Sequence, residues 1–387
     1  MKPLKILIFA GYYFPFRGGY VESIHGLVNR LVKKKYQVTI VTCNVYQSSL
    51  EEFIDGVRIL RLPSWYALNK TYPIPKPTIT FLRIIWDLWR EKYDIISTQT
   101  RFFPTSFLGA FLAFIKRIPL IHTERGSCHS VVQSRFVDIA SRLIDHTLGF
   151  FIVRVARQNI GVSKAACDFL KHIGAKHISR IPNGVKLISS LSNEEKRKLK
   201  EKWGFSSKDY ILLFVGRLIY AKGLQDVLAI IPSLINEQPN LKLVIVGDGQ
   251  YSTDLRKLQT NLHLGKKVRF LGLLQAAEVE ECLQIADAFV NPSHSEGLPR
   301  SVLEAAAIGL PIVASDVGGT SEIILHKKTG LLFQPKDLKT LKAYLQKTLT
   351  DRLYANELGS AARKHLEANF TWKRIVQSYI DLFREVV

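Results

Sequence analysis

The sequence predicts an α/β protein built from two doubly wound parallel-sheet domains in tandem. The chain has 387 residues, which are too many for one ordinary hydrophobic core and enough for two domains of about 150–200 residues. Short β-branched and apolar runs alternate with longer amphipathic segments, as in repeated β-α-β units. This alternation restarts after Pro182-Asn183-Gly184. We therefore expect one domain over residues 1–185 and a second over 186–369.

The first half begins with a short apolar run at residues 5–10 (KILIFA), as expected for a strand buried on both faces. A loop with Gly18-Gly19 follows, and then apolar residues recur at helical spacing from Ile24 to Val32. A β-branched run at 38–42 completes a strand–loop–helix–strand unit. Further strands of the same sheet are expected at 95–96, 120–122 and 159–162.

The second half repeats this pattern after a charged stretch at 194–202. The first strand is expected at 211–215 (ILLFV) and is followed by a glycine turn and a helix. Ligands of doubly wound folds bind outside the carboxyl ends of the strands, and in two-domain proteins they bind in the cleft between the domains. The other strands of this domain are expected at 243–246, 268–271, 288–291, 312–314 and 331–333.

The charge is concentrated in the first half of the chain. There are 54 Lys and Arg against 33 Asp and Glu, a net charge of +21. Residues 1–187 hold 27 basic and 11 acidic residues, or +16, and residues 188–387 hold the remaining +5. The first half is therefore expected to face a negative partner, and nucleic acid and anionic lipid are both candidates. A generally basic proteome with no specific partner is the alternative.

The four cysteines stand singly, without the spacing of a disulfide scaffold or a zinc finger, and this fits a reducing compartment. No apolar stretch reaches the ~18 residues that span a bilayer. The N-terminus has no cleavable signal pattern. We expect a cytoplasmic protein. The cysteines are Cys43, Cys128, Cys167 and Cys282.

The first chemical motif is Gly216-Arg217 with Lys222-Gly223. The strand at 211–215 delivers Arg217 to its carboxyl end, and Lys222 stands at the start of the next helix. Two cations beside a helix N-terminus suit a diphosphate, which needs positive charge and N–H donors. Ordinary surface cations are the alternative.

The second motif is the segment NPSHSEGLPRSVLEAAAIGLP at 291–311. Glu296 lies in the loop after a strand, and Glu304 lies about one turn into the following helix. Two such carboxylates can accept hydrogen bonds from two sets of sugar hydroxyls. The N–H groups of Gly297, Leu298 and the first helical turn can meet an anion. A capping carboxylate with a solvated helix glutamate is the alternative.

These motifs and several others, in this order and at this spacing, resemble the retaining nucleotide-sugar glycosyltransferases of family 4, which have the GT-B fold of two Rossmann-like domains facing a cleft. The resemblance extends almost from end to end. Its remaining elements are the Gly18-Gly19 loop, Ile181-Pro182-Asn183-Gly184-Val185, Val246-Gly247-Asp248-Gly249, Val268-Arg269-Phe270-Leu271-Gly272, Ala286-Asp287, Val317-Gly318-Gly319 and Phe370-Thr371-Trp372.

The resemblance implies a role for each motif. Arg217 and Lys222 would neutralise the donor diphosphate as it leaves, and Glu296 would bind the transferred sugar. Glu304 would bind the ribose hydroxyls. The backbone near Phe270 and Leu271 would hold the base.

Glycines would let the backbone approach the donor closely; for any one glycine loop, a tight turn is the alternative. The expected donor-binding backbone includes Gly18, Gly19, Gly216, Gly297 and Leu298. The family retains the anomeric configuration, and front-face attack passes the acceptor proton to the leaving phosphate. The resemblance therefore implies no protein nucleophile, cofactor or metal. A helix at about 370–387 is expected to pack back on the first domain.

One position departs from the family. A histidine commonly precedes glycine near the end of the strand at 120–122, and this chain has Arg125 before Gly126. A permanent cation has replaced a neutral hydrogen-bonding group. Arg125 is a candidate catalytic residue that either binds an anionic group of a substrate or pairs with Glu124 or another acid. The nearby His122 and His129 are expected to be structural.

Aromatic and basic residues alternate between residues 61 and 92, a composition that suits the headgroup region of an anionic membrane. The phenylalanines at 102–114 recur at helical spacing, which favours a core helix, with a membrane surface as the alternative. We expect peripheral association with the inner face of the membrane, and a lipid-linked or cell-envelope glycan as acceptor. The residues at 61–92 are Trp65, Tyr66, Tyr72, Phe81, Trp86 and Trp89 with Arg61, Lys70, Lys76, Arg83, Arg90 and Lys92.

Two other function classes remain. A nucleotide-sugar epimerase or hydrolase of the same fold would bind the same diphosphate, but it would need acid/base residues and no acceptor surface. A nucleic-acid-binding protein would explain the charge of +21 but not Glu296, Glu304 and the glycine loops. We therefore expect a nucleotide-diphosphate sugar as partner, and no nucleic acid.

Overall fold

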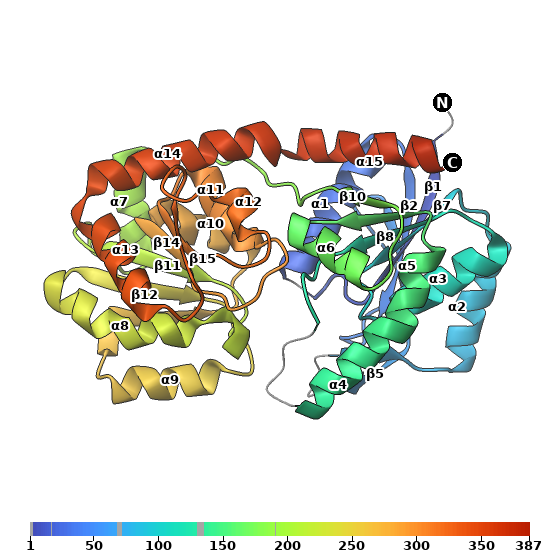
Figure 1. The fold of residues 1–387 in the computed structure, drawn as a ribbon, viewed down its shortest axis with the longest axis horizontal. Coiled ribbons are helices and arrows are strands. Elements are labelled where there is room, and N and C mark those ends of the chain that lie inside the picture. The colour runs from blue at the N-terminus through green and yellow to red at the C-terminus, as the bar shows by residue number, and fades with distance from the viewer. Residues whose placement is uncertain (1–2, 17, 68–71, 130–134, 190) are drawn as a thin grey trace. The chain divides into compact units, whose positions relative to one another are not determined.

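The computed structural model describes residues 3–16, 18–67, 72–129, 135–189 and 191–387 (Figure 1). The chain forms two compact units. The N-terminal unit consists of residues 1–184 and 372–387, and the C-terminal unit consists of residues 185–371. Each unit is built on a largely parallel sheet with helices on both faces, as the sequence predicts.

The sheet of the N-terminal unit has the strand order β10-β9-β8-β7-β1-β2-β4-β3. All its pairs are parallel except the edge pair of β3 and β4. A separate antiparallel hairpin is formed by β5 (Ser64–Ala67) and β6 (Tyr72–Pro75). The strands of the main sheet are β1 (Lys5–Ala10), β2 (Gln37–Cys43), β3 (Glu51–Ile54), β4 (Val57–Leu62), β7 (Ile95–Gln99), β8 (Leu120–Glu124), β9 (Gln158–Gly161) and β10 (Ile178–Arg180).

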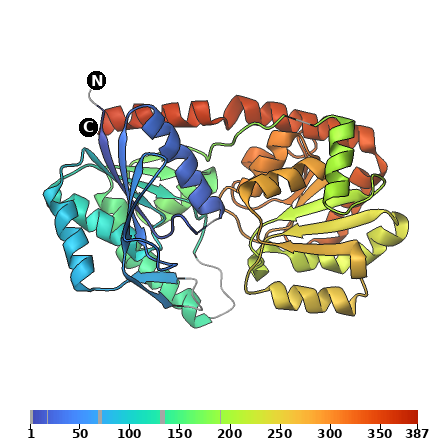
Figure 2. The same ribbon diagram turned by 180° about the vertical axis from the view of Figure 1, so that it is seen from behind.

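Residues of β1 alternate between two cores, because successive side chains of a strand point to opposite faces. Ile6 and Ile8 join a core formed with α1 and α15, which lie side by side (Figure 2). Leu7 and Phe9 join the core formed with α2, α3 and α5. The helices of this unit are α1 (Gly19–Lys33), α2 (Ile79–Arg90), α3 (Pro104–Lys116), α4 (Arg135–Ile144), α5 (Phe150–Val155), α6 (Lys164–His172) and α15 (Trp372–Val386), with a π-helical turn, η1 (Asp145–Gly149), between α4 and α5.

The helix α15 packs into the core of the N-terminal unit through Trp372. A Cβ atom built on Gly26 would lie 2.2 Å from the Trp372 ring, and one built on Gly184 would lie 2.5 Å from it. The guanidinium of Arg30 lies over the same ring, 4.6 Å from its centroid. The indole therefore occupies space that only two glycines leave open, and the C-terminal helix completes the core that α1 begins.

The sheet of the C-terminal unit is fully parallel, with the strand order β13-β12-β11-β14-β15-β16. The chain builds outward from β11 to β13 and then returns to lay β14 on the other side of β11. The strand order thus reverses between β11 and β14, and doubly wound sheets bind ligands at such a point. The strands are β11 (Tyr210–Val215), β12 (Leu241–Val246), β13 (Val268–Gly272), β14 (Ala288–Asn291), β15 (Ile312–Ser315) and β16 (Leu331–Phe333).

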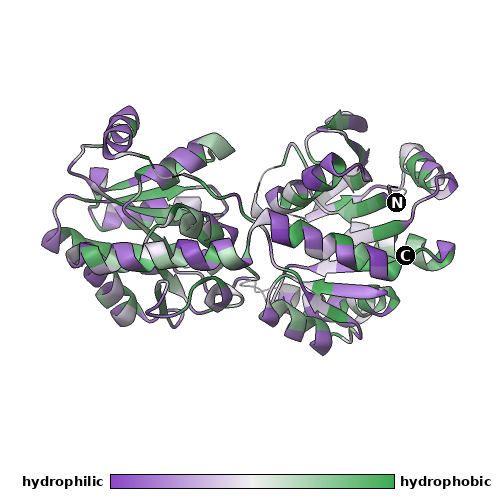
Figure 3. Cartoon of the chain, turned by 90° about the horizontal axis from the view of Figure 1, so that it is seen from above, coloured by the Kyte–Doolittle hydropathy of each residue, from purple (hydrophilic) through white to green (hydrophobic). Residues whose placement is uncertain are grey.

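Helices cover both faces of this sheet. The core on one face includes residues of α8 and α13, whereas α10 contacts β11, and α11 contacts β14 and β15 (Figure 1). The strands are mainly apolar and the outer helices alternate between polar and apolar residues (Figure 3). The helices are α7 (Asn193–Lys202), α8 (Leu224–Glu237), α9 (Ser252–Asn261), α10 (Ala276–Ile285), α11 (Arg300–Ile308), α12 (Thr320–Ile323), α13 (Leu338–Thr350) and α14 (Arg352–Asn369), with 3₁₀ turns η2 (Tyr220–Lys222) and η3 (Gly265–Lys267).

The structure adds elements that the sequence pattern did not predict. The strands β3, β4 and β10 lie in segments for which no strand was expected, and β5 and β6 lie in the region that was interpreted only as an aromatic and basic surface. Among the described residues, no helix combines the length and the apolar character needed to cross a membrane.

Candidate functional site

The predicted donor site lies mainly at the carboxyl ends of β11 and β14, where the strand order of the C-terminal unit reverses. The loop after β11 carries Gly216, Arg217 and, at the end of the 3₁₀ turn η2, Lys222. The loop after β14 carries Glu296. The two loops are joined directly, because the N–H of His294 donates to the carbonyl of Ala221 at 2.8 Å.

Lys222 and Glu296 form the centre of this site. The Nζ of Lys222 lies 2.6 Å from Oε1 of Glu296, and the side chains are only 19% and 8% exposed. The hydroxyl of Ser293 donates to the same carboxylate oxygen at 2.7 Å. A cation and a carboxylate from different strand ends are therefore held in contact and largely shielded from water. This contact brings together two residues that the sequence analysis placed in separate motifs.

Two glycines allow these loops to pack backbone against backbone. Gly223 has a φ of +67°, and a Cβ atom on it would lie 1.9 Å from the carbonyl oxygen of Pro292. Gly318 has a φ of +54°, and its Cβ atom would lie 1.8 Å from the carbonyl oxygen of Glu296. Any larger residue would push the loops apart and move Lys222 or Glu296. Glycine is thus required on both sides of the ion pair.

Arg217 presents an exposed cation in the loop after β11, the loop that also carries Lys222. Within the described part of the chain, its side chain makes no ion pair or hydrogen bond. Its neighbours fix its backbone, because the N–H of Gly216 donates to Val246 and the N–H of Leu218 donates to Asp248. The guanidinium is therefore available to a ligand at the end of β11.

Glu304 lies in the second turn of α11 and is held by Arg300, whose Nε donates to its carboxylate at 2.7 Å. Leu298 is buried, so any part it has in binding would come from its backbone rather than its side chain. The carbonyl of Gly297 accepts the N–H of Gly319 at 2.8 Å, and this bond links the loops after β14 and β15.

Phe270 and Leu271 lie on β13, the edge strand of the sheet, with β12 between them and β11. Both are partly buried, and the guanidinium of Arg256 lies 4.6 Å from the centroid of the Phe270 ring. The expected base-binding segment is thus in the same unit as the ion pair but two strands away from β11.

Arg125 follows β8 in the N-terminal unit, where two amide side chains hold its guanidinium. Nη1 donates to Oδ1 of Asn183 at 2.5 Å, and Nη2 donates to Oε1 of Gln99 at 3.1 Å. The main-chain N–H of Arg125 donates to Oε1 of Glu124 at 2.9 Å. The planar guanidinium of Arg125 is therefore oriented by two neutral amide groups from other segments of the same unit.

Gly18 and Gly19 begin the helix whose next residue, Tyr20, approaches this arginine. Gly18 is the N-cap of α1, and Gly19 is its first residue. The hydroxyl of the next residue, Tyr20, donates to the carbonyl of Gln99 at 3.1 Å, and the Arg125 guanidinium lies 5.9 Å from the Tyr20 ring centroid. The start of α1 and the loop after β8 thus meet at Gln99.

A buried charge network, which the sequence analysis missed, supports the loop of Arg125. Glu124 is fully buried, and Nη1 of Arg101 lies 3.0 Å from its Oε2. Burial raises the pKa of this carboxyl, but the Arg101 charge, a hydrogen bond with His122 and the N–H of Gly126 outweigh that effect. The net result is a pKa well below the usual range for glutamate. Glu124 is therefore a carboxylate, and it accepts hydrogen bonds from the main-chain N–H groups of Arg125 and Gly126.

The structure corrects part of the predicted membrane surface. Arg61 is only 1% exposed, and it bonds the carbonyls of Ser49 and Phe14 and pairs with Glu52. It is an internal cation of the unit and not a surface one. Lys70 and the side chain of Tyr66 lie outside the described residues.

The phenylalanines expected in the core are divided between core and surface. Phe107 packs partly buried against the core, whereas Phe111 and Phe114 are 48% and 60% exposed. They are among the exposed large apolar residues of α2, α3, α4, η1 and α5, which we together call the apolar helical layer and which the sequence analysis recognised only in part. Its exposed residues are Ile79, Leu82, Trp86, Trp89, Phe111, Phe114, Ile115, Ile139, Leu143, Leu148 and Phe150.

Two family models together match most of the chain. Residues 17–188 match the family described as Glycosyltransferase Family 4, and residues 195–365 match Glycosyl transferases group 1. The boundary between the two matches coincides with the change from one unit to the other.

Full-length relatives have glycosyltransferase names. An uncharacterized glycosyltransferase of Methanocaldococcus jannaschii is 28% identical and covers 100% of both chains. The alpha-monoglucosyldiacylglycerol synthase of Streptococcus pneumoniae is 28% identical, over 98% of this chain and 86% of its own. The UDP-Gal:alpha-D-GlcNAc-diphosphoundecaprenol alpha-1,3-galactosyltransferase of Escherichia coli is 27% identical, over 86% and 85%.

Solved structures show the same fold. Sucrose-phosphate synthase from Thermosynechococcus elongatus has a TM-score of 0.81 at 22% identity and covers 99% of this chain and 98% of its own. The Anabaena protein HepE in complex with UDP-glucose has a TM-score of 0.79 at 19% identity, over 99% and 100%. The chain therefore belongs to the family 4 type of glycosyltransferases and has their GT-B fold.

Proposed function

We propose that this glycosyltransferase moves a sugar from a nucleotide-diphosphate sugar to a hydroxyl of a lipid-linked or cell-envelope glycan acceptor, with retention of the anomeric configuration and without a metal in the chemical step. The reaction takes place at the inner face of an anionic membrane.

The contact between Lys222 and Glu296 carries this proposal. In a nucleotide sugar the anomeric carbon is bonded directly to an oxygen of the distal phosphate, so phosphate and sugar hydroxyls lie within a few bonds of each other. A site that binds both groups must therefore place a cation for the phosphate close to a carboxylate for the sugar hydroxyls. The 2.6 Å between Nζ and Oε1 provides that arrangement at the switch point of the sheet.

The chain's own residues supply charge and position for the reaction. Lys222 and Arg217 stabilise the negative charge that develops on the diphosphate as the bond between C1 and the phosphate oxygen breaks. The acceptor hydroxyl attacks C1 from the same face, and its proton passes to the departing phosphate oxygen. Glu296 holds the sugar hydroxyls during this step. No side chain acts as a nucleophile.

The nucleotide is assigned to the remaining predicted residues. Glu304 accepts hydrogen bonds from the ribose hydroxyls, and the backbone at Phe270 and Leu271 holds the base. HepE, which shares this fold, was solved with UDP-glucose, and this supports a nucleotide-sugar donor.

The acceptor is assigned to the N-terminal unit. The apolar helical layer exposes Trp86 and Trp89 on α2 beside Arg83 and Arg90, a combination that favours the headgroup region of an anionic bilayer. Exposed large apolar residues of the C-terminal unit instead stand apart on different elements. Two relatives are named for lipid products or substrates, a glucosyldiacylglycerol and a diphosphoundecaprenol.

Arg125 is assigned to an anionic group of donor or acceptor, such as a uronate carboxylate or a lipid phosphate. Its guanidinium is presented as a planar fork by Gln99 and Asn183. Such a fork matches carboxylate and phosphate oxygens at two points.

The test is incubation of the purified chain with a panel of nucleotide sugars, with and without polyprenyl-phosphate-linked and diacylglycerol acceptors. Transfer that requires an acceptor and preserves the anomeric configuration of the donor supports the proposal. Conversion of the donor without any acceptor would instead indicate an epimerase or hydrolase. Activity that EDTA abolishes and Mg²⁺ restores would contradict a chemical step without metal.

A further inference from the structure

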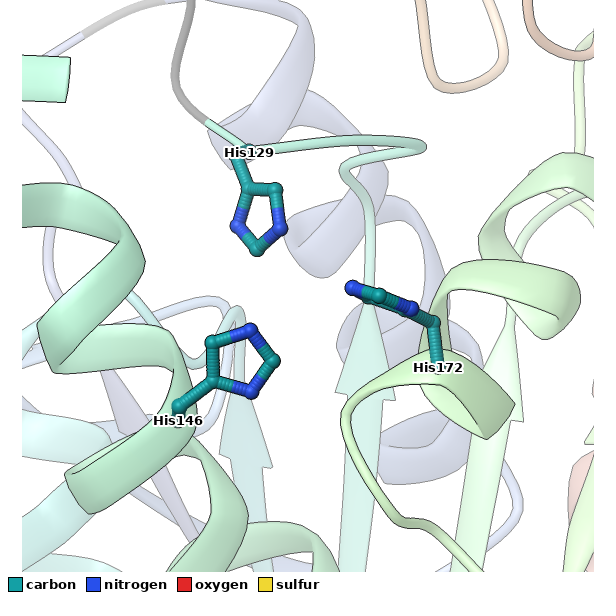
Figure 4. A group of neighbouring side chains, drawn as sticks. All are labelled: His129, His146 and His172. Carbon is teal, nitrogen blue, oxygen red and sulfur yellow. The ribbon is translucent and has the colours of Figure 1, made fainter. Parts of the chain in front are cut away.

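Three histidines of the N-terminal unit form a nearly equilateral triangle. The ring centroids of His129, His146 and His172 are separated by 5.5–5.6 Å in each pair. One ring nitrogen from each lies within 4.8 Å of the others. Figure 4 shows the three rings turned toward a common centre.

The three rings come from three different elements. His129 lies in the loop after β8, His146 lies in the π-helical turn η1, and His172 is the final residue of α6. A π-helical turn inserts one residue into a helix and often marks a functional position. In this chain the inserted turn directs His146 to the side where the other two rings meet.

A buried carboxylate orients one of the rings. The Nδ1 of His129 lies 2.7 Å from Oδ2 of Asp145, which is fully buried and also bonded to Arg101. A carboxylate at this distance accepts a hydrogen bond from Nδ1–H, and this tautomer leaves the lone pair on Nε2. The same carboxylate–histidine arrangement orients metal-binding histidines, because it fixes the tautomer and makes the free nitrogen a better donor.

The geometry is close to that of a zinc site. A point equidistant from three atoms that are at most 4.8 Å apart lies at most about 2.8 Å from each, and zinc–imidazole bonds are about 2.0–2.1 Å long. Each ring would therefore move inward by up to about 0.8 Å. His146 and His172 are exposed and can make that movement. Three imidazoles with a fourth, open position form a common zinc coordination set.

We propose that His129, His146 and His172 form a binding site for Zn²⁺, distinct from the donor site in the C-terminal unit. The ion ties the loop after β8 to η1 and α6. Because the same loop carries Arg125, the bound ion restricts the movement of the segment that presents this cation. Water would take the fourth coordination position, and the ion takes no part in the transfer step.

The experiment uses the full chain without an affinity tag, stripped of metal and then titrated with Zn²⁺ against a chromophoric chelator. One equivalent of Zn²⁺ should bind per chain. Co²⁺ in its place should give the visible absorption bands of a site with nitrogen ligands and low coordination number. Loss of an outer-shell partner typically weakens metal binding 10–100-fold, so loss of a ligand should weaken it by more than about 100-fold.

The variants are His146→Gln and His172→Gln, which change exposed side chains and leave the buried network in place. The control is His177→Gln, an exposed histidine of the same unit that lies outside the triangle. Loss of binding in both variants with retention in the control supports the site. Absence of saturable binding in the parent chain, or equal affinity in all four proteins, would overturn it. No sugar donor is present, so the result is independent of the proposed transfer reaction.

Discussion

Arg101 and Asp145 form a two-point ion pair inside the N-terminal unit, with Nε 2.8 Å from Oδ1 and Nη2 3.0 Å from Oδ2. The third nitrogen of the same guanidinium lies 3.0 Å from Glu124. One cation thus compensates two fully buried carboxylates. Glu124 precedes Arg125 and Asp145 precedes His146, so this one group supports both the candidate substrate cation and the histidine triangle.

Replacement of Arg101 by alanine should destabilise the protein strongly, because Glu124 and Asp145 would remain buried without their cation. Breaking a buried pair in this way typically costs about 3–5 kcal/mol. The measurement is the free energy of unfolding in urea. Arg142→Ala is the control, since this exposed residue lies 3.5 Å from Asp138 on the helix surface and should contribute less than about 1 kcal/mol. Similar small losses in both variants would contradict the role of Arg101.

Stability should fall in acid partly because of Glu124. Its folded-state pKa lies below its usual range, so its contribution is present above the unfolded-state pKa of about 4.3 and is lost as the pH falls from there. Unfolding measured between about pH 7 and pH 3 should therefore depend less on pH in Glu124→Gln than in the parent chain. Glu201→Gln, at an exposed position of α7, is the control and should keep the parent slope. An unchanged slope in Glu124→Gln would exclude this carboxyl as a source of the acid sensitivity.

Removal of either member of the central ion pair should abolish most of the transfer activity. Lys222→Ala and Glu296→Gln should each lower kcat about 10²–10³-fold, the usual loss when a charge-stabilising group is removed. Lys202→Ala is the control, because Lys202 also pairs with a glutamate, Glu281, at 2.7 Å but on the surface. Circular dichroism checks that each variant folds. Folded variants of Lys222 and Glu296 with near-parental turnover would show that the site is assigned wrongly.

Membrane binding should depend on charge and on the apolar helical layer. The double variant Arg83→Glu/Arg90→Glu should lose flotation with anionic vesicles, and binding by the parent chain should weaken at 1 M salt, where the screening length is about 3 Å. Lys257→Glu, an exposed change in the C-terminal unit, is the control. Equal binding of the parent chain to neutral and anionic vesicles would contradict the proposed surface.

Substitution at Arg125 should reveal which substrate carries the anionic group. Arg125→Lys keeps the charge but loses the planar fork, so a two-point contact predicts a clear rise in KM for one substrate. Arg125→His should raise the same KM further. Steady-state kinetics with donor and acceptor varied separately distinguish the two substrates. If both variants keep all constants of the parent chain, Arg125 has no part in substrate binding.

The sequence predicted the parallel strands other than β4 and β10, and the loops that follow β11 and β14, because their signals are local. An apolar run such as 211–215 indicates by its composition alone that it is a buried strand. Gly223 and Glu296 each follow such a run at a short distance along the chain. The contact between Lys222 and Glu296 was not predicted, since the order in which the strands pair decides which loops become neighbours.

Other features were beyond local patterns. The hairpin of β5 and β6 contains prolines and has only four residues in each strand, so no alternation was visible. Arg101 and Asp145 are far apart in the sequence, and no local pattern indicates that either residue is buried or that the two form an ion pair. Arg61 looked like a surface cation because arginine is usually exposed, but the carbonyls of Ser49 and Phe14 and the carboxylate of Glu52 provide it with an internal site.

The place of Trp372 between Gly26 and Gly184 has a consequence for biosynthesis. A ribosome makes residues 185–371 before it makes α15, and at about 5–20 residues per second this interval and α15 itself take about 10–40 s. During that time the apolar side of α1 has emerged without the helix that later covers it. The nascent N-terminal unit therefore keeps this part of its core uncovered until α15 has been made.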